Sequence, residues 1–272
     1  MKPRALKPRA LAVAGLALLL AGCGGGAPPA APAPSAASSA APSAATESGT
    51  VTVLAAASLT EAFGNLEKRF EADHPGVDVK LNFAGSSDLA QQIVNGAPAD
   101  VYAAASDATM KTVTDAGLAA GTPTIFATNV LQIATAPGNP KGIASFAGLA
   151  EPDLKVVVCA PQVPCGSAAE KIEKATGVTL SPVSEEADVR STLGKVSSGD
   201  ADAGLVYVTD VQAAGTAVSG VNFPEANQAT TNYPITVLKN APQAQAAQQF
   251  VDVVTGTDGQ QALKEAGFGP GK

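Results

Sequence analysis

The chain has 272 residues, a formal net charge of −7 and a single histidine, His74. One histidine excludes a metal site with several histidine ligands, and the acidic balance argues against a nucleic-acid-binding protein, which needs a basic surface. The hydrophobic fraction of 46% is enough for a core in one large domain or in two small ones.

The first residues have the pattern of an export signal. Four basic residues within positions 1–9 precede an apolar run over 10–20, which is too short to span a bilayer as a mature helix. The sequence LAGC then ends at Cys23 and resembles the lipobox of bacterial lipoproteins, in which the cysteine becomes the lipidated N-terminus. We therefore predict a lipoprotein signal peptide over 1–22 and a lipid on Cys23. The alternative is an ordinary secretory signal with a coincidental cysteine.

Residues 23–49 consist almost entirely of Gly, Ala, Pro and Ser. Such a segment has almost nothing to bury, so we predict a disordered tether before a folded part that begins near Thr50. Loss of the signal peptide would change the net charge from −7 to −11, because it removes four basic residues and no acidic one. The predicted location is the cell membrane, with the protein lipid-anchored on the extracytoplasmic face.

Strands and helices alternate in the next part of the chain. An apolar, β-branched run over 51–57 and an alternating pattern over 77–83 predict strands, and 101–105 predicts a third. Helical spacing of apolar residues predicts one helix from Ser58, with a capping-box spacing, and another after Ser86. This order with short joints indicates a parallel α/β unit.

A comparable series follows residue 130 and indicates a second α/β lobe. Helices are predicted to begin near Ser167, again with a capping-box spacing, and near Asp188, and an amphipathic helix is predicted over 243–254. Extended, apolar or alternating runs predict strands over 131–135, 156–158, 203–208 and 233–238.

Apart from Cys23, the chain has two cysteines, Cys159 and Cys165. An exported protein meets oxidising conditions, in which a pair of thiols tends to form a bridge. The short loop that such a bridge would close corresponds to about 2.4 kcal/mol of chain entropy. A redox site would normally have the spacing C-x-x-C, so we predict a structural disulfide.

Three predicted helices begin directly behind predicted strands, at Ser58, at Ser86 and at Gly166-Ser167. Ligands of parallel α/β units bind beyond the carboxyl ends of the strands, where helix starts offer unpaired N–H groups and the positive end of a dipole. Each serine alone is better explained as a structural N-cap. The combination of Ser58 and Ser86 behind adjacent strands makes an anion site an equal alternative to two caps.

Six short runs resemble the molybdate-binding proteins of bacterial ABC importers and occur in that family's order: VLAAASLT, FAGSSDL, GAPADVY, VPCG, ADVR and GLVY. The resemblance covers most of 50–272. It implies a two-lobed periplasmic-binding-protein fold, each lobe a mostly parallel sheet flanked by helices, with the ligand in the interlobe cleft. The first lobe is expected to comprise 50–128 and 237–272, and the second lobe 129–236.

The resemblance also implies a ligand set made of neutral donors. Ser58 and Ser86 would give hydroxyl and backbone N–H groups, with Ser87 as second choice for Ser86. The other expected ligands are the backbone N–H groups of Cys165 and Val189 and the phenolic hydroxyl of Tyr207. Without the resemblance, Val189 and Tyr207 have the pattern of core residues and Cys165 that of a structural cysteine.

Two charged residues near these motifs are not expected to bind the anion. Arg190 follows Val189 on the predicted helix and should face elsewhere. Asp100 is expected to be a turn or cap residue, because its carboxylate would repel an anion.

The function implied is a binding protein and not an enzyme. The protein would capture molybdate or tungstate through the oxygens of the ion, with no residue as a direct metal ligand and no cofactor, and deliver it as a monomer to an ABC permease. The alternative is the same fold binding sulfate or another tetrahedral oxyanion. A serine hydrolase using Ser58 or Ser86 would need a G-x-S-x-G elbow, which the sequence lacks.

Overall fold

The computed structural model of the protein describes residues 48–271. The predicted signal peptide, Cys23 and nearly all of the predicted tether lie outside the described residues. The chain divides into two units, Met1–Ala44 and Ala45–Lys272, and every described residue lies in the second. Between residues 48 and 271, no helix has the length and apolar character needed to cross a membrane.

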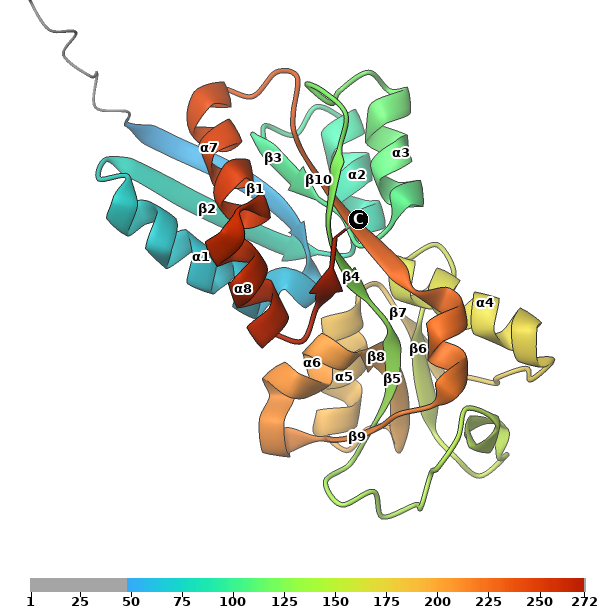
Figure 1. The fold of residues 1–272 in the computed structure, drawn as a ribbon. Helices are drawn as coiled ribbons and strands as arrows, with labels where there is room; N and C mark the ends of the chain where they lie inside the picture. The colour runs from blue at the N-terminus through green and yellow to red at the C-terminus, as the bar shows by residue number, and fades with distance from the viewer. Residues whose placement is uncertain (1–47, 272) are drawn as a thin grey trace, which may run out of the picture. The chain divides into compact units, whose positions relative to one another are not determined.

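Segments from both ends of the described chain build one six-stranded sheet, in the order β11-β4-β10-β3-β1-β2 (Figure 1). β1 pairs in parallel with β2 and with β3, whereas β10 runs antiparallel to β3 and β4. We call this sheet with its helices the first lobe. Its strands are β1 (Gly49–Ala56), β2 (Val77–Ala84), β3 (Val101–Ala103), β4 (Thr124–Asn129), β10 (Thr231–Val237) and β11 (Gly269–Pro270).

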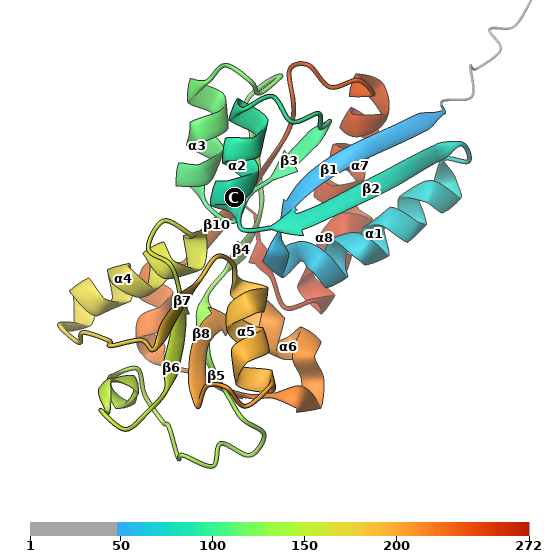
Figure 2. The same cartoon turned by 180° about the vertical axis from the view of Figure 1, so that it is seen from behind.

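Helices cover both faces of the first sheet, as Figures 1 and 2 show from opposite sides. One face packs against α1 (Thr60–Asp73), α7 (Ala244–Thr255) and α8 (Thr257–Glu265), where the ring of Phe250 lies edge-on to those of Phe63 and Phe70. The other face packs against α2 (Ser86–Val94) and α3 (Asp107–Asp115). The predicted parallel order of strand, helix, strand, helix and strand is confirmed.

A second sheet has five strands in the order β7-β6-β8-β5-β9, and with its helices it forms the second lobe. β6 pairs in parallel with β7 and β8, and β5 is antiparallel to β8 and β9. The strands are β5 (Leu131–Thr135), β6 (Val156–Cys159), β7 (Ser184–Glu186), β8 (Ala203–Tyr207) and β9 (Ser219–Val221). The helices are α4 (Pro164–Thr176), α5 (Val189–Ser197) and α6 (Val208–Ala214).

The chain passes between the two sheets twice. It leaves the first sheet after β4, beside the expected limit at 128–129, and returns to it with β10. The sequence assigned 231–236 to the second lobe, whereas β10 pairs with β3 and β4 in the first. The alternating pattern of this segment predicts a strand, but it contains no information about which sheet the strand joins.

Two predicted helix starts are wrong in detail. A short 3₁₀ turn, Ala57–Leu59, precedes α1, so Ser58 lies within that turn and its hydroxyl makes no cap bond. α4 begins at Pro164, so Ser167 lies inside the helix and not at its cap. Proline is favoured in the first turn of a helix, where its missing N–H is not needed.

Candidate functional site

All five predicted ligand residues line one cavity between the lobes. The first lobe contributes the carboxyl ends of β1 and β2 with the residues that follow, and Ala105 after β3. The second lobe contributes the starts of α4 and α5 and the end of β8. The cavity is small, with a volume of about 10 Å³ for the centre of a water-sized sphere. Ser58, Ser86, Cys165, Val189 and Tyr207 are therefore brought together, although they come from five separate segments.

Three helices point their N-terminal ends at this cavity. Ser86 opens α2 behind Gly85, Cys165 lies in the first turn of α4, and Val189 opens α5. The N–H groups of a first helical turn have no partner within the helix and carry the positive end of its dipole. The arrangement can accept a negative charge without a basic side chain.

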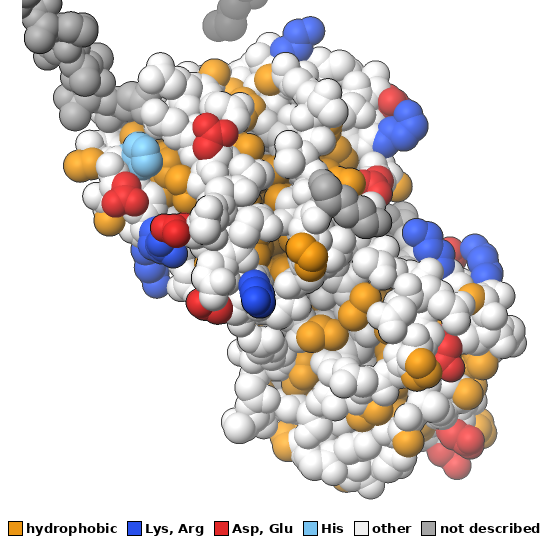
Figure 3. Space-filling view, in the orientation of Figure 1, with side chains coloured by type: hydrophobic (Ala, Val, Ile, Leu, Met, Phe, Trp, Pro, Cys, Tyr) orange, Lys and Arg blue, Asp and Glu red, His pale blue; other side chains and the backbone are white. Residues whose placement is uncertain are grey.

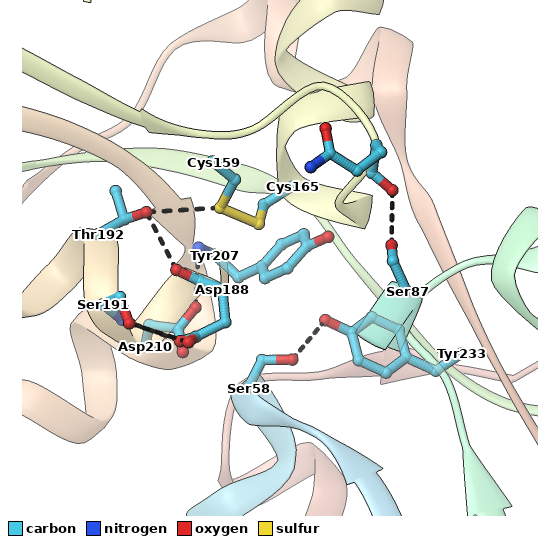
Figure 4. Close-up of a disulfide and its surroundings, with 11 residues drawn as sticks. Ser58, Ser87, Cys159, Cys165, Asp188, Ser191, Thr192, Tyr207, Asp210 and Tyr233 are labelled. Carbon is cyan, nitrogen blue, oxygen red and sulfur yellow. Dashed lines mark hydrogen bonds between the residues drawn. A yellow bond between two sulfur atoms is a disulfide. The ribbon is translucent and has the colours of Figure 1, made fainter. Parts of the chain in front are cut away.

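Both serine hydroxyls are hydrogen-bonded to neighbouring groups. The backbone N–H of Ala105 donates to Ser86 Oγ at 2.9 Å, and Ser58 Oγ lies 2.8 Å from the hydroxyl of Tyr233 (Figure 4). Ser87, the second choice, does not line the cavity and donates its hydroxyl to the carbonyl of Gln162 at 2.6 Å. The geometry thus favours Ser86 over Ser87 as a cavity donor.

Tyr207 is wholly buried, and its hydroxyl has no hydrogen-bond partner among residues 48–271. A buried hydroxyl without a partner is unfavourable, so this atom is available for a ligand. The ring of Tyr207 lies edge-on to that of Tyr233, with centroids 6.0 Å apart. Burial raises the pKa of both tyrosines above the ordinary value, so both phenols keep their protons as donors.

The predicted disulfide between Cys159 and Cys165 is present in the structure. It ties the end of β6 to the first turn of α4, beside Tyr207 (Figure 4). The segment that carries the N–H of Cys165 is thereby joined covalently to the central sheet of the second lobe. Such a bond reduces the freedom that this segment would lose when it binds a ligand.

Charged side chains keep away from the cavity, apart from Asp188. The carboxylate of Asp188 caps α5 by accepting from the N–H and hydroxyl of Ser191. Asp100 does not line the cavity, as expected, but it is not a local turn or cap residue: it is buried and accepts from the distant backbone N–H groups of Thr52 and Gln243. Of the described residues, no Lys or Arg lines the cavity. On the face shown in Figure 3, basic and acidic side chains are interspersed.

The lobes contact each other around the cavity. Arg190 on α5 lies 2.9 Å from the carboxylate of Glu61 on α1, so it faces away from the cavity as expected. The bond from Ser87 to Gln162 joins α2 to the loop before α4. Gly85 of the first lobe lies so close to the carbonyl oxygen of Ala187 that a Cβ at this position would overlap it.

Two residues beside the site were missed by sequence reasoning. Tyr233 had the pattern of a core residue in an alternating strand, and nothing in its surroundings indicated a bond to Ser58. Asp210 on α6 is buried and accepts from the N–H of Tyr207 at 3.0 Å, while its Oδ1 has no partner in the described chain. Burial raises the pKa of Asp210 to about 7, although the Tyr207 N–H and Arg190 act in the opposite direction.

A family model described as bacterial extracellular solute-binding protein matches residues 51–269. The molybdate-binding protein ModA of Mycobacterium tuberculosis is 52% identical over 219 residues, which cover 80% of this chain and 84% of that protein. The solved structure of the Azotobacter vinelandii periplasmic molybdate-binding protein matches with a TM-score of 0.69 at 23% identity, covering 80% of this chain and 98% of that one. The sulfate-binding protein SubI of Mycobacterium tuberculosis matches with a TM-score of 0.72 at 19% identity, covering 81% and 86%.

The two structural likenesses show the fold and confirm the predicted two-lobed α/β architecture. The family match and the identity to the mycobacterial relative extend over most of the chain, and they confirm that the protein binds a solute and is not an enzyme. The chain belongs to the bacterial extracellular solute-binding proteins.

Proposed function

We propose that this protein captures molybdate or tungstate outside the cytoplasmic membrane and delivers it to an ABC permease. The main support is the cavity itself, in which three helix starts and the hydroxyls of Ser58, Ser86 and Tyr207 converge without a basic side chain. The names of relatives such as the mycobacterial molybdate-binding protein give the ligand class. The proposed ligand set adds the backbone N–H groups of Cys165 and Val189.

Neutral donors suffice for a dianion because several fixed N–H and O–H groups can replace its hydration shell, and helix ends supply partial positive charge. An overall negative charge does not prevent this, since salt screens long-range forces over about 8–10 Å. The site also works against an oxyanion that carries a proton, because the one carboxylate that lines it, Asp188, already accepts from Ser191 with both oxygens. This disfavours phosphate at neutral pH.

The alternative is the same fold binding sulfate or another tetrahedral oxyanion, and the structural likeness to a sulfate-binding protein keeps it open. Thermal unfolding of the purified protein with molybdate, tungstate, sulfate and phosphate distinguishes the proposal from this alternative. A ligand at about 100 times its Kd should add about 2.7 kcal/mol, which raises the Tm of a protein of this size by roughly 5–11 °C. A shift with sulfate alone would favour the alternative. No shift with molybdate or tungstate would contradict the proposal.

The proposal includes lipid attachment at Cys23 and a monomeric protein held at the outer face of the cell membrane. Cells that express the chain and are fed a labelled fatty acid should incorporate the label into the wild-type protein and not into Cys23→Ala. Label of equal strength in both proteins would show that Cys23 is not the lipidated residue. Cys159 and Cys165 remain in this variant, so any label attached to them would appear in both proteins.

A further inference from the structure

We propose that Tyr233 fixes the direction of the Ser58 hydroxyl, so that Ser58 donates its proton into the cavity and Tyr233 becomes a determinant of anion selectivity. This inference rests on the proposed function. Tyr233 lies on β10 in the first lobe, is wholly buried and does not line the cavity itself. Its hydroxyl lies 2.8 Å from Ser58 Oγ, and its ring packs edge-on against Phe126 and Phe268. The side chain is therefore held in one place by its neighbours.

Burial decides which of the two hydroxyls donates. Among the described residues, Ser58 Oγ is the hydrogen-bond partner found for the hydroxyl of Tyr233. If Tyr233 did not donate to Ser58, its proton would have only Asn129 and Tyr207 nearby, and neither makes a hydrogen bond to it in the described chain. A phenol is also the more acidic hydroxyl and so the better donor. Ser58 Oγ therefore accepts, and its own proton points to the remaining open side, which is the cavity that Ser58 lines.

The hydroxyl of Ser86 is held in a similar way, but by a main-chain N–H group. The N–H of Ala105 donates to Ser86 Oγ and leaves the Ser86 proton free for the cavity. Each serine oxygen is thus engaged by a protein donor, one from a backbone and one from a side chain. An oxyanion without protons can accept from both serines, whereas an oxyanion that carries a proton must share a serine oxygen that already accepts one hydrogen bond. The Ala105 N–H cannot be removed by substitution, but the Tyr233 hydroxyl can.

Tyr233→Phe tests the inference in the purified protein. Without the phenol, the Ser58 hydroxyl can rotate and its oxygen becomes free to accept. We expect the affinity for molybdate to fall about 10-fold, near the lower limit for the loss of one hydrogen bond to a charged ligand. We expect the affinity for phosphate to fall less or to rise, so that the phosphate-to-molybdate affinity ratio, measured by calorimetry or competition, increases about 10-fold. If Tyr233 had only a packing role, Tyr233→Phe would lower the affinities for molybdate and phosphate by the same factor. That result would overturn the inference.

Tyr102→Phe is a matched control. Tyr102 is also wholly buried, and its hydroxyl donates to the backbone carbonyl of Ser86 and not to a serine hydroxyl. Its loss removes a comparable hydrogen bond without freeing a serine oxygen, so the ratio of the two affinities should stay at the wild-type value. An increase in this variant equal to that of Tyr233→Phe would overturn the inference.

Ser58→Ala supplies a second test that leaves the core ring of Tyr233 in place. It removes both the Ser58 donor and the oxygen that Tyr233→Phe would free, so the affinity for molybdate should fall while no new acceptor appears for a proton-bearing anion. Adding Tyr233→Phe to Ser58→Ala should then change the ratio no further, because the two residues act through one hydroxyl. A further change would overturn the inference. Wild-type protein that bound no oxyanion at all would overturn the proposed function, and this inference with it.

Discussion

Gly85→Ala is expected to abolish tight anion binding while leaving both lobes folded. The backbone angles of Gly85, φ −58° and ψ 131°, are open to any residue, so alanine introduces no backbone strain. A Cβ at this position would nevertheless overlap the carbonyl oxygen of Ala187, which belongs to the other lobe. To relieve the overlap, the backbone at Gly85 or at Ala187 must shift, and we expect the lobes to move apart at the cavity. An anion would then lose donors from one lobe, and the loss of two charge-assisted hydrogen bonds corresponds to about 100-fold or more in Kd.

Titration calorimetry with molybdate measures the affinity of this variant, and thermal unfolding without ligand measures its stability. Gly64→Ala is the matched control, because Gly64 lies on α1 and a Cβ there meets nothing within 4 Å. The control should bind as the wild type does and gain up to about 1 kcal/mol of stability from the better helix propensity of alanine. Wild-type affinity in Gly85→Ala would show that the close approach of the lobes is not needed for binding. A large fall in its ligand-free Tm would assign the effect to folding.

The sequence predicted the first lobe best where each segment carries its own periodicity. β1, α1, β2 and α2 have clear apolar spacing, and their order alone implies parallel pairing. α3 and α8 were missed because their sequences, DATMKTVTD and TDGQQALKE, contain few apolar residues to mark a buried face. The exact start of α1 was also missed. Ser58 has the spacing of a cap, but its hydroxyl bonds to a residue 175 positions away, which no local pattern can reveal.

The residues of the candidate site also differ in whether local sequence predicts them. Ser58 and Ser86 follow from their positions behind strands, whereas Cys165, Val189 and Tyr207 were expected only from the resemblance to a family. Two of these three are expected to contribute a backbone N–H, which any residue type can supply. Their roles therefore leave little trace in local sequence, and the structure shows only that they line the same cavity.

Asp210 is expected to contribute stability to the ligand-free protein that is lost as the pH rises from about 4 to about 7. Burial raises the pKa of this carboxyl from 3.8 to about 7, while the hydrogen bond from the Tyr207 N–H and the charge of Arg190 lower it, and Glu61 and Asp188 raise it. The folded protein thus binds a proton that the unfolded chain releases in this range. Stability is fully present below the unfolded pKa and declines until the pH passes the folded pKa.

Asp210→Asn isolates this contribution, since an amide oxygen can still accept from the Tyr207 N–H but carries no charge. Urea unfolding between pH 4 and pH 8 should show the wild type losing up to about 4 kcal/mol relative to the variant, from three pKa units at about 1.36 kcal/mol each. The difference between the two curves is the relevant quantity, because other carboxyl groups titrate in both proteins. Parallel curves would mean that Asp210 is ionised throughout and that its buried Oδ1 finds a partner. A growing difference between the two stability curves would show that Asp210 takes up a proton when the protein folds at low pH.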